Sequence, residues 1–112
     1  MKKIEIIVGT QKLEDLKAIF HELDVTGLNI VNAMGYGNQK GIVKKYRGEE
    51  YKIDLLPKIK IETVVADEEA DAIIEKVANE MKTGNYGDGK IFVSEVLDVI
   101  RIRTGEHGTD AL

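Results

Sequence analysis

A strand pattern, a helix pattern and a second strand pattern follow one another twice in this chain of 112 residues. In the strand patterns apolar and polar residues alternate, as in residues 58–66, where Ile59 and Ile61 fall on one face and Lys60 and Glu62 on the other. In the helix patterns apolar residues recur at helical spacing along one stripe. The first unit comprises residues 3–8, 13–23 and 28–34, and the second comprises residues 58–66, 67–82 and 90–96.

Two such units in one short chain predict an α+β fold of the ferredoxin-like split βαβ type, with the order βαββαβ. We expect a four-stranded antiparallel sheet with both helices on one face, and Asp67 as the N-cap of the second helix. Residues 1–112 would form a single domain, with a long loop at 35–57 between strands 2 and 3, a short extra strand at 97–103 and a tail at 104–112 that is a loop or a frayed end. Isoleucine and valine on the uncovered sheet face would be buried by symmetry mates, so we expect an oligomer.

Composition excludes several classes of function. The net charge of −4 argues against a general nucleic-acid binder, and residues 58–66 lack the aromatic residues that an RNA-recognition module places on its third strand. The absence of cysteine excludes disulfides and thiolate chemistry. No apolar run is long enough to span a bilayer and no signal-peptide core follows Met1, so we expect a cytoplasmic protein without membrane insertion.

Residues 83–90 combine three glycines with a terminal lysine between a helix pattern and a strand pattern. Glycines allow a ligand to approach the backbone closely, and their N–H groups beside the ammonium of Lys90 can form a cradle for an anion such as phosphate. The alternative is a helix C-cap at Gly84 followed by a tight turn.

Arg101 and Arg103 add to this cationic set. They alternate with isoleucines in residues 97–103, which places both guanidinium groups on one face of a strand and suits them to phosphate oxygens. A solvated strand face is the alternative. Together with Lys58 and residues 87–90, they predict binding of a phosphorylated small molecule.

The loop at 35–57 is the least regular part of the chain. It carries a basic middle and three tyrosines, Tyr36, Tyr46 and Tyr51, which are typical of a surface that recognises another protein. A flexible hairpin whose charges only solvate it is the alternative.

Catalysis has little support in the sequence. His21 and His107 fall on the first helix and in the tail, and neither has a second ligand at metal-binding spacing, so we expect no catalytic residue and no intrinsic metal site. An acylphosphatase would carry its phosphate loop after the first strand, where this chain has Gly-Thr-Gln-Lys at residues 9–12. A small phosphate-handling enzyme of that kind and a purely structural trimer stay open as alternatives.

Several ordered motifs resemble those of the PII nitrogen signal-transduction proteins, over essentially the whole chain. Residues 83–93 read Thr-Gly-Asn-Tyr-Gly-Asp-Gly-Lys-Ile-Phe-Val, like the C-terminal signature of that family, and residues 99–106 read Val-Ile-Arg-Ile-Arg-Thr-Gly-Glu, like the family ending. Residues 46–51, Tyr-Arg-Gly-Glu-Glu-Tyr, resemble the motif around the loop tyrosine that some bacteria uridylylate, which corresponds to Tyr51. Residues 35–41 and 56–62 fall where the family has its loop base and its third strand.

The resemblance implies a homotrimer that binds an adenine nucleotide, ATP or ADP, in clefts between subunits, and a loop that docks on a target such as an ammonium channel, another transporter or a nitrogen-metabolism enzyme. Many members also bind 2-oxoglutarate through Mg-ATP, where Gln39 would contact the metal and the acid. The family usually has an arginine at the position of Asn38, near the terminal phosphate, so ADP would bind here as well as ATP. The close alternative is a PII-like regulator that responds to ADP, lacks 2-oxoglutarate sensing and governs a different transporter. The residues that the resemblance assigns to the nucleotide site are Gly35, Gly37, Asn38, Gln39, Lys58, Glu62, Val64, Gly87, Asp88, Gly89 and Lys90, with Arg101 and Arg103 from a neighbouring subunit.

Overall fold

The computed structural model describes residues 1–25, 27–36, 42–46, 49–53 and 55–112. Within these residues a four-stranded sheet has the order β2-β5-β1-β6, and each neighbouring pair is antiparallel. This arrangement confirms the predicted α+β fold, with β1 and β5 in the centre. The strands are β1 (Lys2–Gly9), β2 (Asn29–Gly35), β5 (Leu56–Val65) and β6 (Lys90–Glu95).

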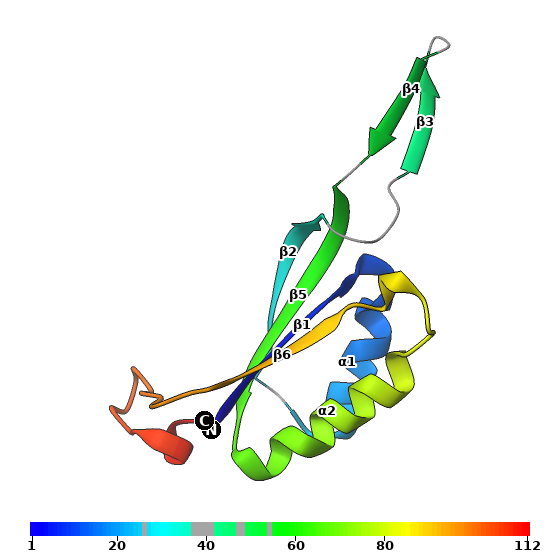
Figure 1. The fold of residues 1–112 in the computed structure, drawn as a ribbon. Coiled ribbons are helices and arrows are strands. Elements are labelled where there is room, and N and C mark those ends of the chain that lie inside the picture. Colours follow the sequence, from blue (N-terminus) through cyan, green and yellow to red (C-terminus); the bar gives the residue numbers. More distant parts are fainter. Residues whose placement is uncertain (26, 37–41, 47–48, 54) are drawn as a thin grey trace.

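Helices α1 (Leu13–Glu22) and α2 (Asp67–Met81) both pack on one face of this sheet (Figure 1). Their apolar stripes meet the alternating inward residues of the strands, such as Ile4 and Ile6 in β1 and Ile61 in β5, all of which are buried. Full burial of an aliphatic side chain of this size contributes about 1.5–3 kcal/mol, so this single core stabilises the sheet and both helices together. The buried helix residues are Leu16, Ile19, Phe20, Ala70, Ile73 and Val77.

The start of α2 differs from the sequence prediction. Ala66 is the N-cap, with extended backbone and no side-chain capping bond, and Asp67 is already the first helical residue. The carboxylate of Asp67 lies 2.9 Å from the amino group of Met1, because the pairing of Lys2 with Val65 brings the start of β1 beside the start of α2. The prediction of Asp67 as a cap is therefore wrong. Its negative charge in the first helical turn still stabilises the helix by interacting favourably with the helix dipole.

The segment between β2 and β5 contains a hairpin. Strands β3 (Ile42–Tyr46) and β4 (Glu49–Ile53) pair in an antiparallel two-stranded sheet that lies beyond the ends of β2 and β5 (Figure 1). The sequence pattern predicts an irregular loop here, with a flexible hairpin as the alternative. The hairpin lies apart from both helices (Figure 1).

The C-terminal segment overturns two predictions. Residues 97–103 form no strand and make only an isolated bridge between Ile100 and His107, and the tail is not frayed because it ends in a 3-10 helix, η3 (Gly108–Ala111). Backbone hydrogen bonds fold the segment onto itself, with Arg101 N–H donating to Glu106 O at 2.9 Å and Gly105 N–H to Arg101 O at 2.7 Å. Gly105 has φ +72°, a conformation open to glycine, so the chain reverses there and pairs with its own tail rather than with the sheet.

None of the helices in the described part of the chain is long and apolar enough to cross a membrane.

Candidate functional site

The predicted site residues of the sheet share the face that α1 and α2 leave uncovered. In β1 the buried residues alternate with Lys3, Glu5 and Ile7, whose partners across the ladders therefore lie on this same face. Ile7 pairs with Lys90 on one side, and Lys3 pairs with Val64 on the other. We call this surface the open face; it carries Lys3, Glu5, Ile7, Lys58, Lys60, Glu62, Val64, Lys90 and Phe92.

Charged side chains in the centre of the open face pair with one another. The ammonium of Lys60 lies 2.8 Å from the carboxylate of Glu62, and the ammonium of Lys3 lies 2.9 Å from Glu5 and 3.8 Å from Glu62. The hydrogen bond from Lys60 is the main cause that lowers the pKa of Glu62 below its ordinary value. Glu62 is therefore an anion at neutral pH and can accept hydrogen bonds from a ligand.

The glycine turn is organised around Asp88. The backbone N–H groups of Thr83 and Gly84 each donate to the Asp88 carboxylate at 2.8 Å, and the Thr83 hydroxyl donates to it as well. These bonds, first of all the one from the Thr83 hydroxyl, hold the pKa of Asp88 well below its ordinary value. The amide of Gly84, one of the three glycine amides expected to cradle an anion, thus already binds an internal carboxylate.

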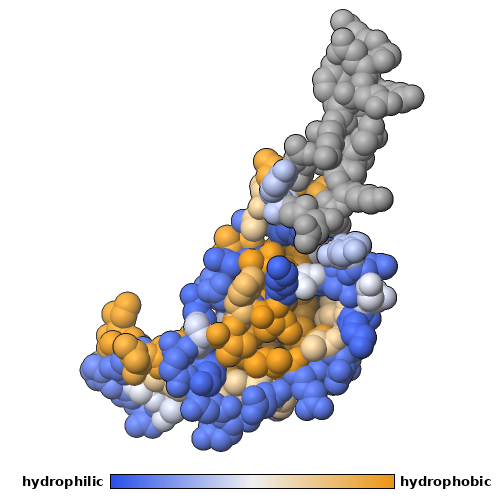
Figure 2. All heavy atoms as spheres, in the orientation of Figure 1, coloured by the Kyte–Doolittle hydropathy of each residue, from blue (hydrophilic) through white to orange (hydrophobic). Residues whose placement is uncertain are grey.

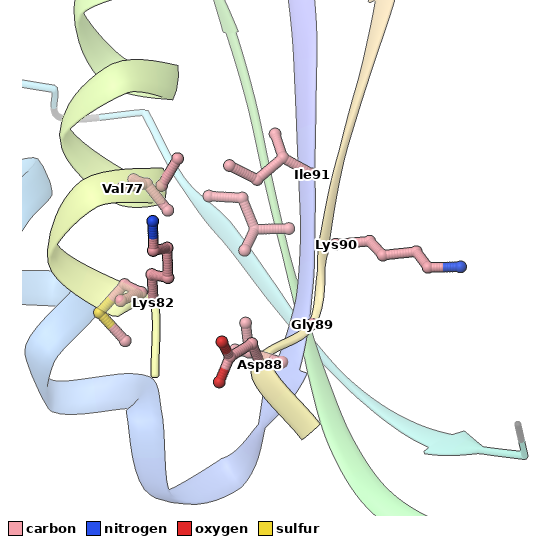
Figure 3. Close-up of a pocket in the computed structure, with 10 residues that line it drawn as sticks. Val77, Lys82, Asp88, Gly89, Lys90 and Ile91 are labelled. Carbon is pink, nitrogen blue, oxygen red and sulfur yellow. The ribbon is translucent and has the colours of Figure 1, made fainter. Parts of the chain in front are cut away.

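The side chains of the turn divide between the two faces of the sheet. The Asp88 carboxylate lies on the side of α2, whereas Lys90 extends away from it, on the open face (Figure 3). Gly89 lies between them with φ +99°, and an added Cβ would lie 2.3 Å from the carbonyl oxygen of Ile7. The turn can therefore press against β1 only because residue 89 is glycine. The C-cap alternative at Gly84 is not what the structure shows, because α2 already ends at Met81 and Lys82 is extended.

Lys58 lies where β2 pairs with β5, next to the start of the segment that contains the hairpin. An added Cβ on Gly35 would lie 2.9 Å from Cγ of Lys58, so the stem of that lysine crosses directly over the glycine at the end of β2. Gly37, Asn38 and Gln39 lie outside the described residues, as does the side chain of Tyr51.

The two arginines lie far from the glycine turn within one chain. They follow the end of β6 opposite to Lys90, and β6 itself separates the two ends by ~17 Å. Arg101 donates to Glu106 at 2.7 Å and to the carbonyl oxygen of Leu112 at 3.2 Å, while Arg103 is exposed in a turn. The predicted placement of both guanidinium groups on one strand face is wrong, because no strand forms there.

A hollow of about 630 Å³ lies at the Val64 end of the open face. Glu62 and Val64 line it together with residues 27–29, which sequence reasoning did not assign to a site. Asn29 pairs with Glu62 across β2 and β5. The alternation of β5, combined with the strand order of the sheet, would therefore have predicted Asn29 as a residue of this hollow. A second hollow of about 290 Å³ lies on the helix side of the glycine turn, between α2 and β6 (Figure 3).

Apolar side chains also reach the surface. Figure 2 shows an apolar area between β6 and α2 and another on the C-terminal segment. Exposed apolar residues of these elements include Val93, Leu97, Ile100 and Ile102, and Ile102 is 98% exposed. Such residues on a single chain are typical of a surface that is covered by a partner.

Comparisons with known proteins give one family. The family model described as "Nitrogen regulatory protein P-II" matches residues 1–106. The chain is 53% identical to a "Nitrogen regulatory protein P-II" of Rhizobium meliloti (strain 1021) and 48% identical to one of Azospirillum brasilense, over all 112 residues and the full length of both. It is 46% identical to "Nitrogen regulatory protein P-II 1" of Methanothermobacter thermautotrophicus, over the whole chain and 97% of that relative.

Proposed function

This chain belongs to the nitrogen regulatory protein P-II family. We propose that it binds an adenine nucleotide and signals the bound state to a target protein through the β3–β4 hairpin. The observation that carries the proposal is that Lys58, Glu62, Val64 and Lys90 share one sheet face, which reaches the base of that hairpin at Gly35 and Lys58. A ligand with one end at Lys58 would lie next to Gly35, the last residue of β2 before the hairpin.

The phosphate end of the site consists of Lys58, Gly87, Gly89 and Lys90. Lys90 directs an ammonium over the open face, and the glycines permit close approach of phosphate oxygens to the backbone. The side chain of Asp88 contributes no ligand here, because its carboxylate is bound on the opposite side of the turn.

The base end of the site is the hollow beside Glu62 and Val64. Val64 offers an apolar surface for an adenine ring, and the carboxylate of Glu62 accepts hydrogen bonds from an amino or hydroxyl group. Val64 lies four residues beyond Lys60, the residue level with Lys90, so the two ends are ~13 Å apart along β5. An elongated ligand with an apolar base and a charged tail matches this polarity.

A second copy of the chain completes the site. Arg101 and Arg103 lie too far from Lys90 to bind the same phosphates within one chain, so a neighbouring subunit of a homotrimer supplies them. The exposed apolar residues Val31, Phe92 and Ile102 support this assembly, since each would leave water at the contacts between subunits.

The nucleotide acts by shifting the population of hairpin conformations, and it can shift that population only by its difference in affinity between them. ADP and ATP both bind, ATP with Mg, and Gln39 connects Mg-ATP to 2-oxoglutarate. The target is an ammonium channel, another transporter or a nitrogen-metabolism enzyme in the cytoplasm. Asn38, in place of the arginine usual in the family, favours a second candidate: a regulator that responds to ADP alone, does not bind 2-oxoglutarate and governs a transporter other than an ammonium channel.

Calorimetric titration of three variants with ADP tests the site. Lys90→Ala and Arg103→Ala should each remove a charge-assisted contact of about 1.5–3 kcal/mol, which weakens ADP binding roughly 10- to 150-fold. Lys82→Ala is the matched control, because the Lys82 side chain lies on the side of α2, whereas that of Lys90 extends away from it (Figure 3). Unchanged affinity in both site variants would reject the assignment.

Mixed assemblies test the sharing of the site between subunits. When the Lys90→Ala and Arg103→Ala chains are unfolded, mixed in equal amounts and refolded together, about one site in four regains both side chains in a trimer. We expect wild-type affinity in that fraction. If both residues belonged to one chain, no mixture would restore any tight site.

A further inference from the structure

We propose that Lys12 is a positioning residue for nucleotide binding: it holds the Asp88–Gly89 peptide, and with it the phosphate-binding turn, in the conformation that receives phosphate. This inference rests on the proposed function, and it assigns a role to a residue outside the open face.

Lys12 joins three elements that are remote in sequence. It lies in the 3-10 helix η1 (Thr10–Lys12) after β1, and its ammonium donates to the carbonyl oxygen of Asp88 at 3.1 Å and to that of Met81, at the end of α2, at 3.4 Å. The same ammonium lies 3.5 Å from the Asp88 carboxylate. Its side chain is only 12% exposed, so the charge is held in place rather than extended into water.

The hydrogen bond to the Asp88 carbonyl sets the direction of the next amide. A peptide group is planar and trans, so its C=O and N–H point in opposite directions. Fixing the Asp88 carbonyl toward Lys12 therefore fixes the Gly89 N–H away from Lys12. Gly89 has little freedom to compensate, because it lies so close to β1 that an added Cβ would be 2.3 Å from the carbonyl oxygen of Ile7.

Charge balance gives Lys12 a second effect on the same site. Asp88 is an anion one residue from each of Gly87 and Gly89, and a bound phosphate would lie close to it. The ammonium of Lys12 and the donors from Thr83 and Gly84 compensate that anion from the helix side. Without Lys12, the carboxylate would repel an incoming phosphate more strongly.

The test compares ADP with adenosine, which lacks phosphate and reports on the base end alone. Lys12→Met keeps the aliphatic stem and removes the charge, and Lys12→Arg keeps a positive charge. Lys17→Met on the exposed side of α1 is the control, since Lys17 pairs only with Glu14 among the described residues. We expect Lys12→Met to weaken ADP binding about tenfold, the size of coupling between residues in contact, with adenosine affinity unchanged. Lys12→Arg should recover most of the ADP affinity, and Lys17→Met should match the wild type.

Asp88→Asn separates the two effects of Lys12, because it removes the charge of the Asp88 carboxylate and keeps the backbone carbonyl. The part of the Lys12→Met effect that comes from charge balance should disappear in the Asp88→Asn background, and the part that comes from the carbonyl should remain. The backbone amide signals of Thr83, Gly84 and Gly89 in a nitrogen-15 NMR spectrum of the nucleotide-free protein should move in Lys12→Met and stay in place in Lys17→Met.

The inference is overturned if Lys12→Met binds ADP as the wild type does, or if it loses ADP and adenosine affinity in equal measure. In either case the proposed function remains supported, provided that the wild-type protein itself binds ADP. A wild type that binds no ADP rejects the proposed function and, with it, the phosphate-positioning role.

Discussion

Gly89→Ala tests how closely the glycine turn presses on the sheet, and Gly84→Ala is its matched control. Both residues have positive φ, +99° and +86°, and both belong to the same turn. They differ in space: an added Cβ at residue 84 meets no atom within 4 Å, whereas at residue 89 it would lie 2.3 Å from the Ile7 carbonyl oxygen and 2.8 Å from Cγ1 of Val8.

The expected costs follow from these surroundings. At residue 84 only the left-handed backbone is penalised, which costs about 1–2 kcal/mol. At residue 89 the backbone lies in a region that is essentially restricted to glycine, with ψ −172°, and this adds about 1–3 kcal/mol. Overpacking against the fixed backbone of a central strand adds about another 1–3 kcal/mol, so we expect a total near 4 kcal/mol for Gly89→Ala.

Urea unfolding at one fixed protomer concentration measures both variants, because the stability of an oligomer depends on concentration. We expect Gly89→Ala to lose about twice as much free energy of unfolding as Gly84→Ala, or more. Equal losses in the two variants would refute the close contact between the turn and β1.

Four further changes test other parts of the account. Thr63→Val should cost about 0.5–1.5 kcal/mol in urea unfolding, because the buried Thr63 hydroxyl donates to Gly27 O at 2.7 Å and valine removes that hydrogen bond; a neutral result would contradict the role of this bond. The folded-state pKa of Asp88 is lowered, so its contribution to stability is present above the unfolded pKa of about 3.9 and is lost as pH falls below it; the stability advantage of the wild type over Asp88→Asn should therefore shrink between about pH 7 and pH 3, and a constant advantage would count against the carboxylate. Phe92→Glu places a charge on the open face and should lower the assembly state in sedimentation experiments, whereas an assembly state equal to that of the wild type would exclude this face from the contacts between subunits. Asn38→Arg should raise ATP affinity relative to ADP in calorimetry, and an unchanged ratio would remove the argument for ADP preference.

The fold and the sheet part of the site follow from local patterns. Alternation in residues 58–66 separates the buried Ile59 and Ile61 from Lys58, Glu62 and Val64, and the structure places the second set on the open face. Helical spacing likewise indicates which stripe of each helix packs on the sheet. These predictions succeed because the period of a strand or a helix is a property of the backbone itself.

The parts that sequence could not predict depend on contacts between distant segments. The alternation of residues 97–103 is that of a strand, but Gly105 turns the chain back and the backbone donors pair with the tail instead of the sheet. In the sequence Asp88 is only an acidic residue within a turn. In the structure it contacts Lys12, which lies 76 positions earlier in the chain. No local pattern marks such a pair, since only the packing of η1 against the end of α2 brings the two together.

Calorimetric titration of the wild-type chain with ADP tests whether this protein binds a nucleotide, with Mg-ATP and then Mg-ATP plus 2-oxoglutarate as further titrants. We predict saturable ADP binding at one site per chain, weakened by Lys90→Ala and unaffected by Lys82→Ala. Binding of 2-oxoglutarate only with Mg-ATP would identify a sensor of nitrogen and carbon, and binding of ADP without any 2-oxoglutarate response would identify a sensor of energy state. A wild-type chain that binds neither ADP nor Mg-ATP would contradict the account.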